Sequence, residues 1–254
     1  VLDCPFTVLS ANFLPASLFN IVNRKNNARI ARWIVEQATA LGFKNYIHLI
    51  DTDIYRSRYL KEYIHPAVSI YYRRDYIIGE AYWRRHGTRL EPELAASADI
   101  VLANSTRFAA ELQPYNPHTY PIETGVNLKL YNPAKKYETP GDMQDIPRPI
   151  IGYMGTINST RLDGELLYQI ISQRPDYSFV FTGPEDDIFR RNRIHSLKNA
   201  YFTGQKKVDE LPAYIAAYDV CINPQMVNEI TDGNYPLKID EYLAMGKPLS
   251  LIHI

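Results

Sequence analysis

The sequence of 254 residues predicts an α/β protein built from two parallel β-sheets. Short apolar runs alternate with stretches of helical periodicity, and this alternation is typical of parallel strands whose faces are covered by helices. The alternation stops once, over residues 133–149, and then resumes. Because that segment holds four prolines and a glycine among many charged residues, we interpret it as a linker between two domains.

The first predicted domain covers residues 1–132. Its strands are predicted at Phe6–Leu9, Tyr46–Ile50, Val68–Tyr72, Ile100–Ala103 and His118–Ile122, which are short apolar runs. Its helices are predicted between them, at about Leu18–Leu41, Arg56–Tyr63, Ile77–Ser97 and Arg107–Leu112. Asn104 and Ser105 precede the last of these helices, and their side chains are expected to cap it.

The second predicted domain covers residues 150–254. Its strands are predicted at Ile150–Met154, Ser178–Thr182, Ala200–Phe202 and Val220–Asn223, and its helices at Leu162–Gln173, Asp209–Ala217 and Leu237–Met245. Residues 249–254 have two interpretations. One back-translation, CTG TCT CTT ATA CAC ATC, resembles the transposase end sequence of DNA library adapters, so these residues would be an artefact. Apolar patterning alone predicts an ordinary strand, and the encoding DNA decides between the two.

Composition excludes several classes of protein. The chain is 46% hydrophobic and 22% charged, which predicts a globular protein with a core. Its 28 basic residues balance 28 acidic ones, and this argues against general binding of nucleic acid. Two isolated cysteines, Cys4 and Cys221, fit a reducing compartment, and Cys221 is expected to be a buried thiol. No apolar run approaches the ~20 residues of a membrane span.

Residues Asn234–Pro248 read N-Y-P-L-K-I-D-E-Y-L-A-M-G-K-P and predict a short helix. Pro236 suits the first helical position, and Gly246 ends the helix. The expected inward-facing residues are Leu237, Ile239, Tyr242 and Leu243. Lys238 and Glu241 share one face near the positive end of the helix dipole, which suits a diphosphate beside the lysine and a ribose diol at the glutamate. The alternative is a capped surface helix with a Lys–Glu pair.

The pattern P-x-K-x-x-E-Y-L-A-x-G-K-P resembles the nucleotide-sugar site of the family-4, or group 1, glycosyltransferases, which have the GT-B fold. Further segments resemble that family in its order: Asp99–Ser105, Thr124–Asn127, Tyr131–Pro133, Ile151–Gly155, Arg161–Asp163, Phe202–Lys206, Glu210–Pro212 and Tyr218–Pro224. The resemblance covers about Tyr71–Pro248. It implies two Rossmann-like domains that face a cleft, and by that pattern both ends of the chain look incomplete.

The resemblance also implies an activity. A hexosyltransferase of this family moves a sugar from a nucleotide-diphosphate sugar to an acceptor hydroxyl, with retention of anomeric configuration and without an essential metal or other cofactor. The expected partners are the nucleotide sugar and a glycan or lipid-linked acceptor of cell-envelope polysaccharide synthesis. The expected location is the cytoplasm, with peripheral association with the inner face of the membrane. Two alternatives stay open: a non-catalytic GT-B-like module that binds nucleotide sugar or glycan, and a nucleotide-sugar epimerase of the same fold.

Arg161 and Lys238 are the candidate catalytic residues, because positive groups stabilise the diphosphate that leaves. Arg161 follows the loop that contains Gly155 and Thr156, at the carboxyl end of a predicted strand, where open α/β sheets bind ligands. Gly155 allows backbone amides to approach the phosphates, and Thr156 is a candidate contact in the same loop. The alternative for Arg161 is a salt bridge to Asp163 or Glu165.

Glu241 aligns with the second glutamate of the family's E-x7-E pattern, which resembles a ribose binder. The first glutamate falls at Gly233 in this chain, so the donor-sugar contact is absent or comes from Asp232, Asn234 or backbone amides. Leu237, at the start of the predicted helix, is a further candidate contact.

Four more candidate contacts lie at the ends of other strands. Gly204 and Lys206 follow a short strand, where relatives place the edge of the nucleobase. Arg73 and Asp75 follow a strand of the first domain and are candidates to contact the acceptor or the sugar; the alternative is a structural Asp–Arg pair. Asp51-Thr52-Asp53 has the Asp-x-Asp spacing of metal-dependent glycosyltransferases, but capping of a loop or helix is preferred, so no metal is expected.

Overall fold

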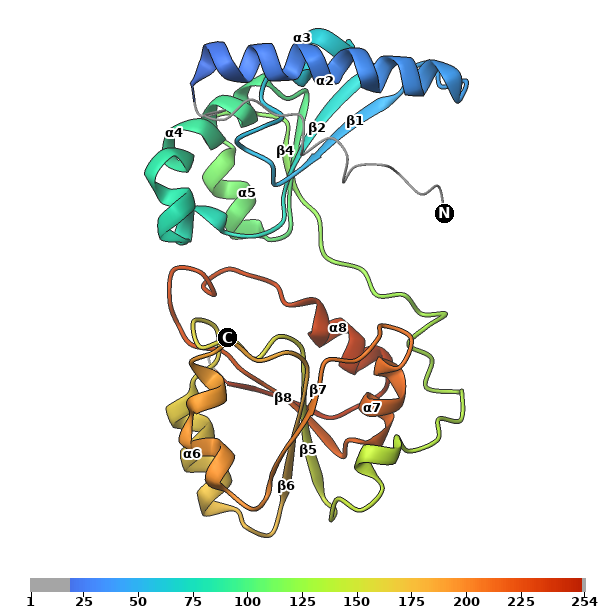
Figure 1. Ribbon diagram of the computed structural model, residues 1–254, viewed down its shortest axis with the longest axis vertical. Helices are drawn as coiled ribbons and strands as arrows, with labels where there is room; N and C mark the ends of the chain where they lie inside the picture. The colour runs from blue at the N-terminus through green and yellow to red at the C-terminus, as the bar shows by residue number, and fades with distance from the viewer. Residues whose placement is uncertain (1–18, 253–254) are drawn as a thin grey trace. The chain divides into compact units, whose positions relative to one another are not determined.

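The computed structural model describes residues 19–252 and divides the chain into two compact units, Val1–Glu123 and Thr124–Ile254. Figure 1 shows that each unit has its own sheet with helices on its faces. The prediction of an α/β protein with two parallel sheets is confirmed. The strand predicted at Phe6–Leu9 and the residue Cys4 lie outside the described residues.

The first unit contains, within the described residues, a sheet of four parallel strands in the order β1-β2-β3-β4. The elements in chain order are α2 (Asn20–Ala40), β1 (Ile47–Asp51), α3 (Leu60–Ile64), β2 (Val68–Arg73), the 3-10 turn η1 (Ile77–Gly79), α4 (Ala81–Ser97), β3 (Ile100–Ala103), α5 (Thr106–Leu112) and β4 (Thr119–Pro121). Leu90 and Leu94 of α4 pack against Tyr71 and Val101 of the sheet, all fully buried. Burial of these apolar surfaces is the main stabilising contribution of the unit.

Two helix starts in the first unit differ from the prediction. α3 begins at Leu60 instead of Arg56, because the side chain of Asp53 accepts hydrogen bonds from the Arg56 amide (3.0 Å) and the Ser57 hydroxyl (2.9 Å) and so holds a turn before the helix. α4 begins at Ala81, because residues Ile77–Gly79 form a separate 3-10 turn. Asp53 therefore caps a turn, as predicted.

The second unit contains, within the described residues, a sheet of five parallel strands in the order β7-β6-β5-β8-β9. Its elements are η2 (Gly141–Met143), β5 (Ile150–Met154), α6 (Gly164–Gln173), β6 (Ser178–Thr182), η3 (Phe189–Arg191), η4 (Arg193–Ser196), β7 (Ala200–Gly204), α7 (Leu211–Ala217), β8 (Val220–Pro224), α8 (Leu237–Ala244) and β9 (Leu249–Ile252). α6 covers one face of the sheet, and α7 and α8 cover the other (Figure 1). Since β9 pairs with β8, Leu249–Ile252 form the ordinary strand that patterning predicts.

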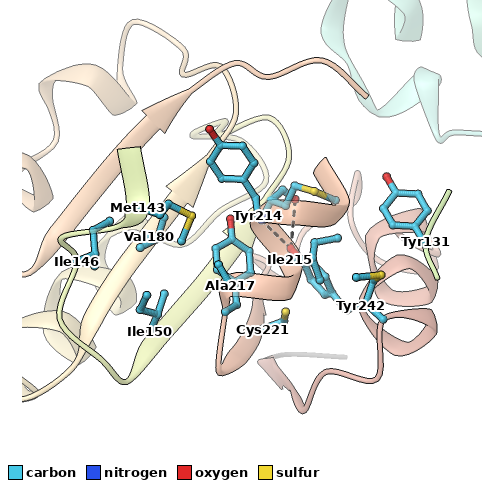
Figure 2. Close-up of a cluster of buried hydrophobic side chains, with 13 residues drawn as sticks. Tyr131, Met143, Ile146, Ile150, Val180, Tyr214, Ile215, Ala217, Cys221 and Tyr242 are labelled. Atoms are coloured by element: carbon cyan, nitrogen blue, oxygen red, sulfur yellow. Dashed lines mark hydrogen bonds between the residues drawn. The ribbon is translucent and has the colours of Figure 1, made fainter. Parts of the chain in front are cut away.

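The segment interpreted as a linker, residues 133–149, is instead part of the second unit. Met143 and Ile146 are buried in the cluster of apolar side chains that Figure 2 shows, between the sheet and α7 and α8. Asp142 accepts hydrogen bonds from Lys206 (2.7 Å) and from the hydroxyl of Tyr214 (2.8 Å). Two apolar anchors and one carboxylate therefore attach a proline-rich segment to the domain.

Gly152, in the middle of β5, gives a test of this packing. A Cβ atom built at Gly152 would lie 2.1–2.4 Å from the ring of Tyr218, which is fully buried. We expect Gly152→Ala to lower the free energy of unfolding by ~1–3 kcal/mol, because the added methyl group would overlap the buried ring of Tyr218 in a closely packed core. Gly125→Ala is the matched control, since nothing lies within 4 Å of its added Cβ, and it should change stability by less than about 0.5 kcal/mol. Equal denaturation midpoints for the two variants would contradict this packing.

Candidate functional site

The carboxyl edge of the second sheet is built around two glycines. Gly155 follows β5 with φ +134° and Gly183 follows β6 with φ +148°, in a backbone region that L side chains rarely adopt. The amide of Gly155 donates to the carbonyl of Thr182 (2.9 Å), and a Cβ at Gly183 would lie 2.0 Å from the Gly155 oxygen. The two strand ends are therefore closer than side chains would allow, and main-chain atoms form this edge.

α8 is fixed against β5 beside this edge. The hydroxyl of Tyr242, which is fully buried, accepts a hydrogen bond from the Met154 amide (2.7 Å). After α8, Gly246 adopts φ +68°, and the amides of Gly246 and Lys247 donate to Leu243 (2.9 Å) and Tyr242 (3.0 Å) in a Schellman motif. The helix thus ends at the predicted glycine and keeps a defined position on the sheet.

The start of α8 and its inward face differ in part from the prediction. Pro236 is the residue before the helix rather than its first residue. Ile239 and Tyr242 are buried as expected, but Leu237 and Leu243 are 45% and 57% exposed. Since α8 is short, only the two residues that face the sheet are covered, and Leu237 stays exposed at the start of the helix.

Lys238 lies on the same face of α8 as Tyr242, one turn earlier. Its Nζ is 2.5 Å from the hydroxyl of Tyr153 and 4.1 Å from the centre of that ring. A Cβ at Gly155 would lie 2.7 Å from Nζ, so the lysine side chain runs directly along the glycine. Burial and, to a smaller extent, the charge of Arg161 together lower the pKa of Lys238 to about 7, and Glu241 acts in the opposite direction.

Arg161 follows β5 and is close enough to act electrostatically on both Lys238 and Tyr153. The two acidic residues predicted as its alternative partners also make contacts elsewhere. Asp163 caps α6 by accepting from the Leu166 amide (2.9 Å), and Glu165 pairs with Arg193 (2.5 Å). The structure therefore brings the two predicted cationic side chains together at one strand end.

Glu241 lies one turn after Lys238 and faces Tyr131. The Tyr131 hydroxyl is buried without a hydrogen bond of good geometry, and Figure 2 shows this residue with Tyr242 at one end of the buried cluster. Burial raises the pKa of Glu241, while Tyr131 and Lys238 lower it. Burial likewise raises the pKa of Tyr131, and the carboxylate of Glu241 adds to this effect. A half-buried carboxylate beside a hydroxyl and an ammonium is a suitable acceptor for the hydroxyl groups of a ligand.

Comparison with known proteins supports the same interpretation. Residues 148–249 match the family model described as glycosyl transferases group 1. Residues 148–249 are thus similar to the group 1 glycosyltransferases. A curated relative, TuaH of Bacillus subtilis (strain 168), is provisionally named a teichuronic acid biosynthesis glycosyltransferase and is 28% identical over 131 residues. That alignment covers 50% of this chain and 32% of TuaH, so the match spans about a third of the relative's length.

Solved structures show the fold. HepE of Anabaena, in complex with UDP-glucose, aligns with a TM-score of 0.65 at 16% identity, over 87% of this chain and 62% of HepE. Sucrose-phosphate synthase of Thermosynechococcus elongatus aligns with a TM-score of 0.60 at 20% identity, over 89% of this chain and 60% of the synthase. The predicted GT-B fold and the resemblance to group 1 glycosyltransferases are confirmed.

Other predicted contacts in the second unit have varied surroundings. Thr156 is exposed in the loop after β5, and Gly204, with φ +71°, is exposed at the end of β7. Lys206 pairs with Asp142, which ties its ammonium to the packed segment before β5. Asn234 is half-buried before α8, where its amide donates to the Thr231 carbonyl (3.1 Å). Gly233 has φ +72°, a conformation that a glutamate in its place would rarely adopt.

In the first unit, Arg73 is a structural residue rather than an exposed ligand contact. Its side chain is 2% exposed and forms ion pairs with Glu91 (3.4 Å) and Glu111 (2.9 Å). Asp75 lies 3.8 Å from Nε of Arg74, which is a structural Asp–Arg pair at the strand end, as the alternative interpretation predicted. Arg73 was misassigned because its two acidic partners come from helices far along the chain.

Two further predictions concern polar residues at strand ends of the first unit. Asp51 pairs with Arg74 (3.1 Å), and within residues 19–252 there is no group of three or more His, Cys, Asp or Glu side chains that could hold a metal ion. Ser105 caps α5 by accepting from the Phe108 amide (3.2 Å), as predicted.

Across residues 19–252, every helix is too short or too polar to span a bilayer.

Two tyrosines near the site were missed by the sequence analysis. Tyr153 lies within the predicted apolar strand Ile150–Met154, and nothing in that pattern marks its hydroxyl as a site group. Tyr131 lies in the segment Tyr131–Pro133 that resembles the family, and its hydroxyl was not singled out. Both hydroxyls reach α8, Tyr153 at Lys238 and Tyr131 at Glu241.

Lys238→Met tests the burial of the ammonium. The folded protein holds the pKa of Lys238 below its unfolded value, so the unfolded state binds more protons between about pH 7 and pH 10. The free-energy cost of burying the ammonium is therefore full below about pH 7, and it disappears as the pH rises to about 10. At about pH 7 we expect the variant to be more stable by on the order of 2 kcal/mol, because water screens a half-buried charge and reduces the full effect.

The measurement is urea denaturation of the parent and of Lys238→Met across this pH range. Lys198→Met, at an exposed lysine, is the matched control and should keep the parent's pH dependence. A constant difference between Lys238→Met and the parent at every pH would contradict the burial of the ammonium.

Proposed function

We propose that the protein containing this chain is a glycosyltransferase that transfers a hexose from a nucleoside-diphosphate sugar to an acceptor hydroxyl. One observation carries the proposal: Lys238 and Arg161 lie together beside the main-chain edge formed by Gly155, next to the start of α8. Two cations beside a glycine at a strand end, next to a helix N-terminus, are a combination suited to a diphosphate. The match of residues 148–249 to the group 1 family model supports it.

The chemical role follows from the charges. When the bond between the anomeric carbon and the diphosphate breaks, negative charge accumulates on the diphosphate oxygens. Lys238 and Arg161, already held in place, stabilise that charge without reorganisation. Two protein cations supply the charge that a divalent metal supplies elsewhere, so we propose transfer without an essential metal. Glu241 accepts hydrogen bonds from the ribose diol and orients the nucleotide.

The stereochemistry and the path of the proton are proposed from the resemblance to the group 1 family. We propose that the acceptor hydroxyl attacks from the side of the leaving diphosphate, so the anomeric configuration is retained. The departing phosphate oxygen takes the proton of the acceptor hydroxyl, and no separate protein base is needed. The first unit would supply the acceptor side, with Asp75 as the remaining predicted contact there.

The nucleotide and the acceptor are proposed from the relatives. HepE was solved with UDP-glucose, so UDP-glucose is the first donor to test. Gly204 and Lys206 would lie near the base, through main-chain atoms, since the Lys206 ammonium is paired with Asp142. TuaH is named for teichuronic acid biosynthesis, so a cell-envelope glycan or its lipid-linked precursor is the proposed acceptor. Such a reaction would take place in the cytoplasm, at the inner face of the membrane.

The deciding experiment incubates the protein that contains this chain with a panel of UDP-, GDP-, ADP- and dTDP-sugars, with and without acceptor glycans. Transfer of the sugar, with stereochemistry read by NMR, supports the proposal. Binding without turnover for every donor would instead indicate a non-catalytic module, which the glycine at position 233 favours. Conversion of the donor sugar in the absence of acceptor would indicate an epimerase.

Lys238→Ala should lower turnover more than nucleotide affinity. The ammonium's interaction strengthens as charge develops on the diphosphate, so we expect kcat to fall ~10²–10³-fold while the affinity for UDP falls far less. The measurement pairs steady-state kinetics with calorimetric binding of UDP. Lys198→Ala serves as the control, and unchanged turnover in Lys238→Ala would remove Lys238 from the mechanism.

A further inference from the structure

The hydroxyl of Tyr153 is shared between two groups of the candidate site. Tyr153 lies in β5, one residue before its end, and its side chain is 2% exposed. The hydroxyl donates to the Thr156 carbonyl (3.1 Å) and accepts from Nζ of Lys238 (2.5 Å). A tyrosine has a single hydroxyl proton, so donation to the carbonyl leaves the oxygen as an acceptor for the lysine.

The ring of Tyr153 acts on the same ammonium. Nζ of Lys238 lies 4.1 Å from the ring centre, within the range of a cation–π interaction. Gly155 closes the other side, because a Cβ there would lie 2.7 Å from Nζ and 3.1 Å from Cε. The lysine side chain is therefore confined between a glycine and a tyrosine ring, with its head bound to the hydroxyl. The hydrogen bond to Tyr153 uses one of the three N–H groups of the ammonium.

We propose that Tyr153 is a positioning residue for Lys238: it holds the ammonium over the Gly155 loop, aimed at the diphosphate of the donor. This inference rests on the proposed function for the identity of the ligand. Its structural half, that the hydroxyl of Tyr153 holds and stabilises the Lys238 ammonium, can be tested without any ligand.

The charged groups around Lys238 determine what removal of the hydroxyl does. Burial is the strongest effect that disfavours the charged form of Lys238. Arg161 disfavours the charged form as well, and Glu241 favours it. Burial also raises the pKa of Tyr153, with Arg161 acting against this, so the hydroxyl stays neutral near pH 7. Tyr153→Phe keeps the ring but removes the acceptor of the ammonium's hydrogen bond. The pKa of Lys238 should therefore fall further, and a larger fraction of the protein should carry a neutral amine.

The first measurement is the titration of Lys238 by NMR in protein with ¹³C-labelled lysine, with the signal assigned by its loss in Lys238→Met. We expect a midpoint near pH 7 in the parent and a midpoint lower by about one pH unit in Tyr153→Phe. Tyr218→Phe is the matched control, because it removes another buried hydroxyl of this unit, bonded to Thr182 (2.6 Å), and it should leave the midpoint unchanged.

The second measurement is the pH profile of sugar transfer from UDP-glucose. In Tyr153→Phe we expect kcat/KM, which reports the free enzyme, to be about tenfold below the parent at about pH 8 and within about twofold of it at about pH 6, where about half of the variant carries the ammonium. A merely structural role would lower kcat/KM equally at both pH values. Tyr218→Phe should follow the parent's profile.

The two measurements distinguish the role of Tyr153 from the proposed function. An unchanged Lys238 midpoint, or a pH profile of Tyr153→Phe that superimposes on the parent's, overturns the positioning role even if Lys238→Ala is inactive. A shifted midpoint in a protein that transfers no sugar confirms the hold of Tyr153 on Lys238 and refutes the proposed function instead.

Discussion

The approach of α8 to the end of β5 is the contact on which the candidate site depends. The buried Tyr242 hydroxyl accepts a hydrogen bond from the Met154 amide, which fixes the helix on the strand. Lys238 lies one turn earlier on the same helix face, so the same contact carries its ammonium to the residue that follows Met154, which is Gly155. Replacement of the glycine by a larger residue would displace the lysine, and loss of the tyrosine hydroxyl would loosen the helix.

Holding a lysine in this position costs free energy in the unliganded protein. Burial and the neighbouring Arg161 both disfavour the charged form of Lys238, and Glu241 compensates only in part. An anion placed between the two cations would remove this repulsion and favour the protonated state. The two cations repel each other in the empty site, and a diphosphate would neutralise this repulsion. Charges that are already held in place in this way are what preorganised electrostatic catalysis requires. Tyr153 and Gly155 determine where that charge lies.

The sequence predicted the second unit well because its signals are local. The start and end of α8 follow from Pro236, directly before the helix, and Gly246, just after it, and the alternation of strands and helices follows from periodicity. The carboxyl ends of parallel strands meet at one edge, so the sequence pattern alone places Gly155, Arg161 and Lys238 together. The boundaries of α3 and α4 were less predictable, because side-chain capping and a 3-10 turn determine them.

Other features depend on contacts between distant residues and left no local signal. Arg73 and Lys238 are both basic residues near strand ends, yet Arg73 meets Glu91 and Glu111 from two other helices and is buried as an ion pair. The proline-rich segment 133–149 has the composition of a linker, but Met143 and Ile146 pack it into the second unit. The sequence did not mark the hydroxyls of Tyr131 and Tyr153 as site groups, because α8, whose side chains they approach, lies far from them in the sequence.

Proton uptake on binding of UDP-glucose tests the central claim most directly. Calorimetry in buffers of different ionisation enthalpy, at about pH 8, reports the protons taken up when the ligand binds. If a diphosphate settles against Lys238, the lysine becomes protonated, so binding should take up a large fraction of one proton, and Lys238→Met should abolish the uptake. Binding without proton uptake, or uptake that persists in Lys238→Met, would contradict the account.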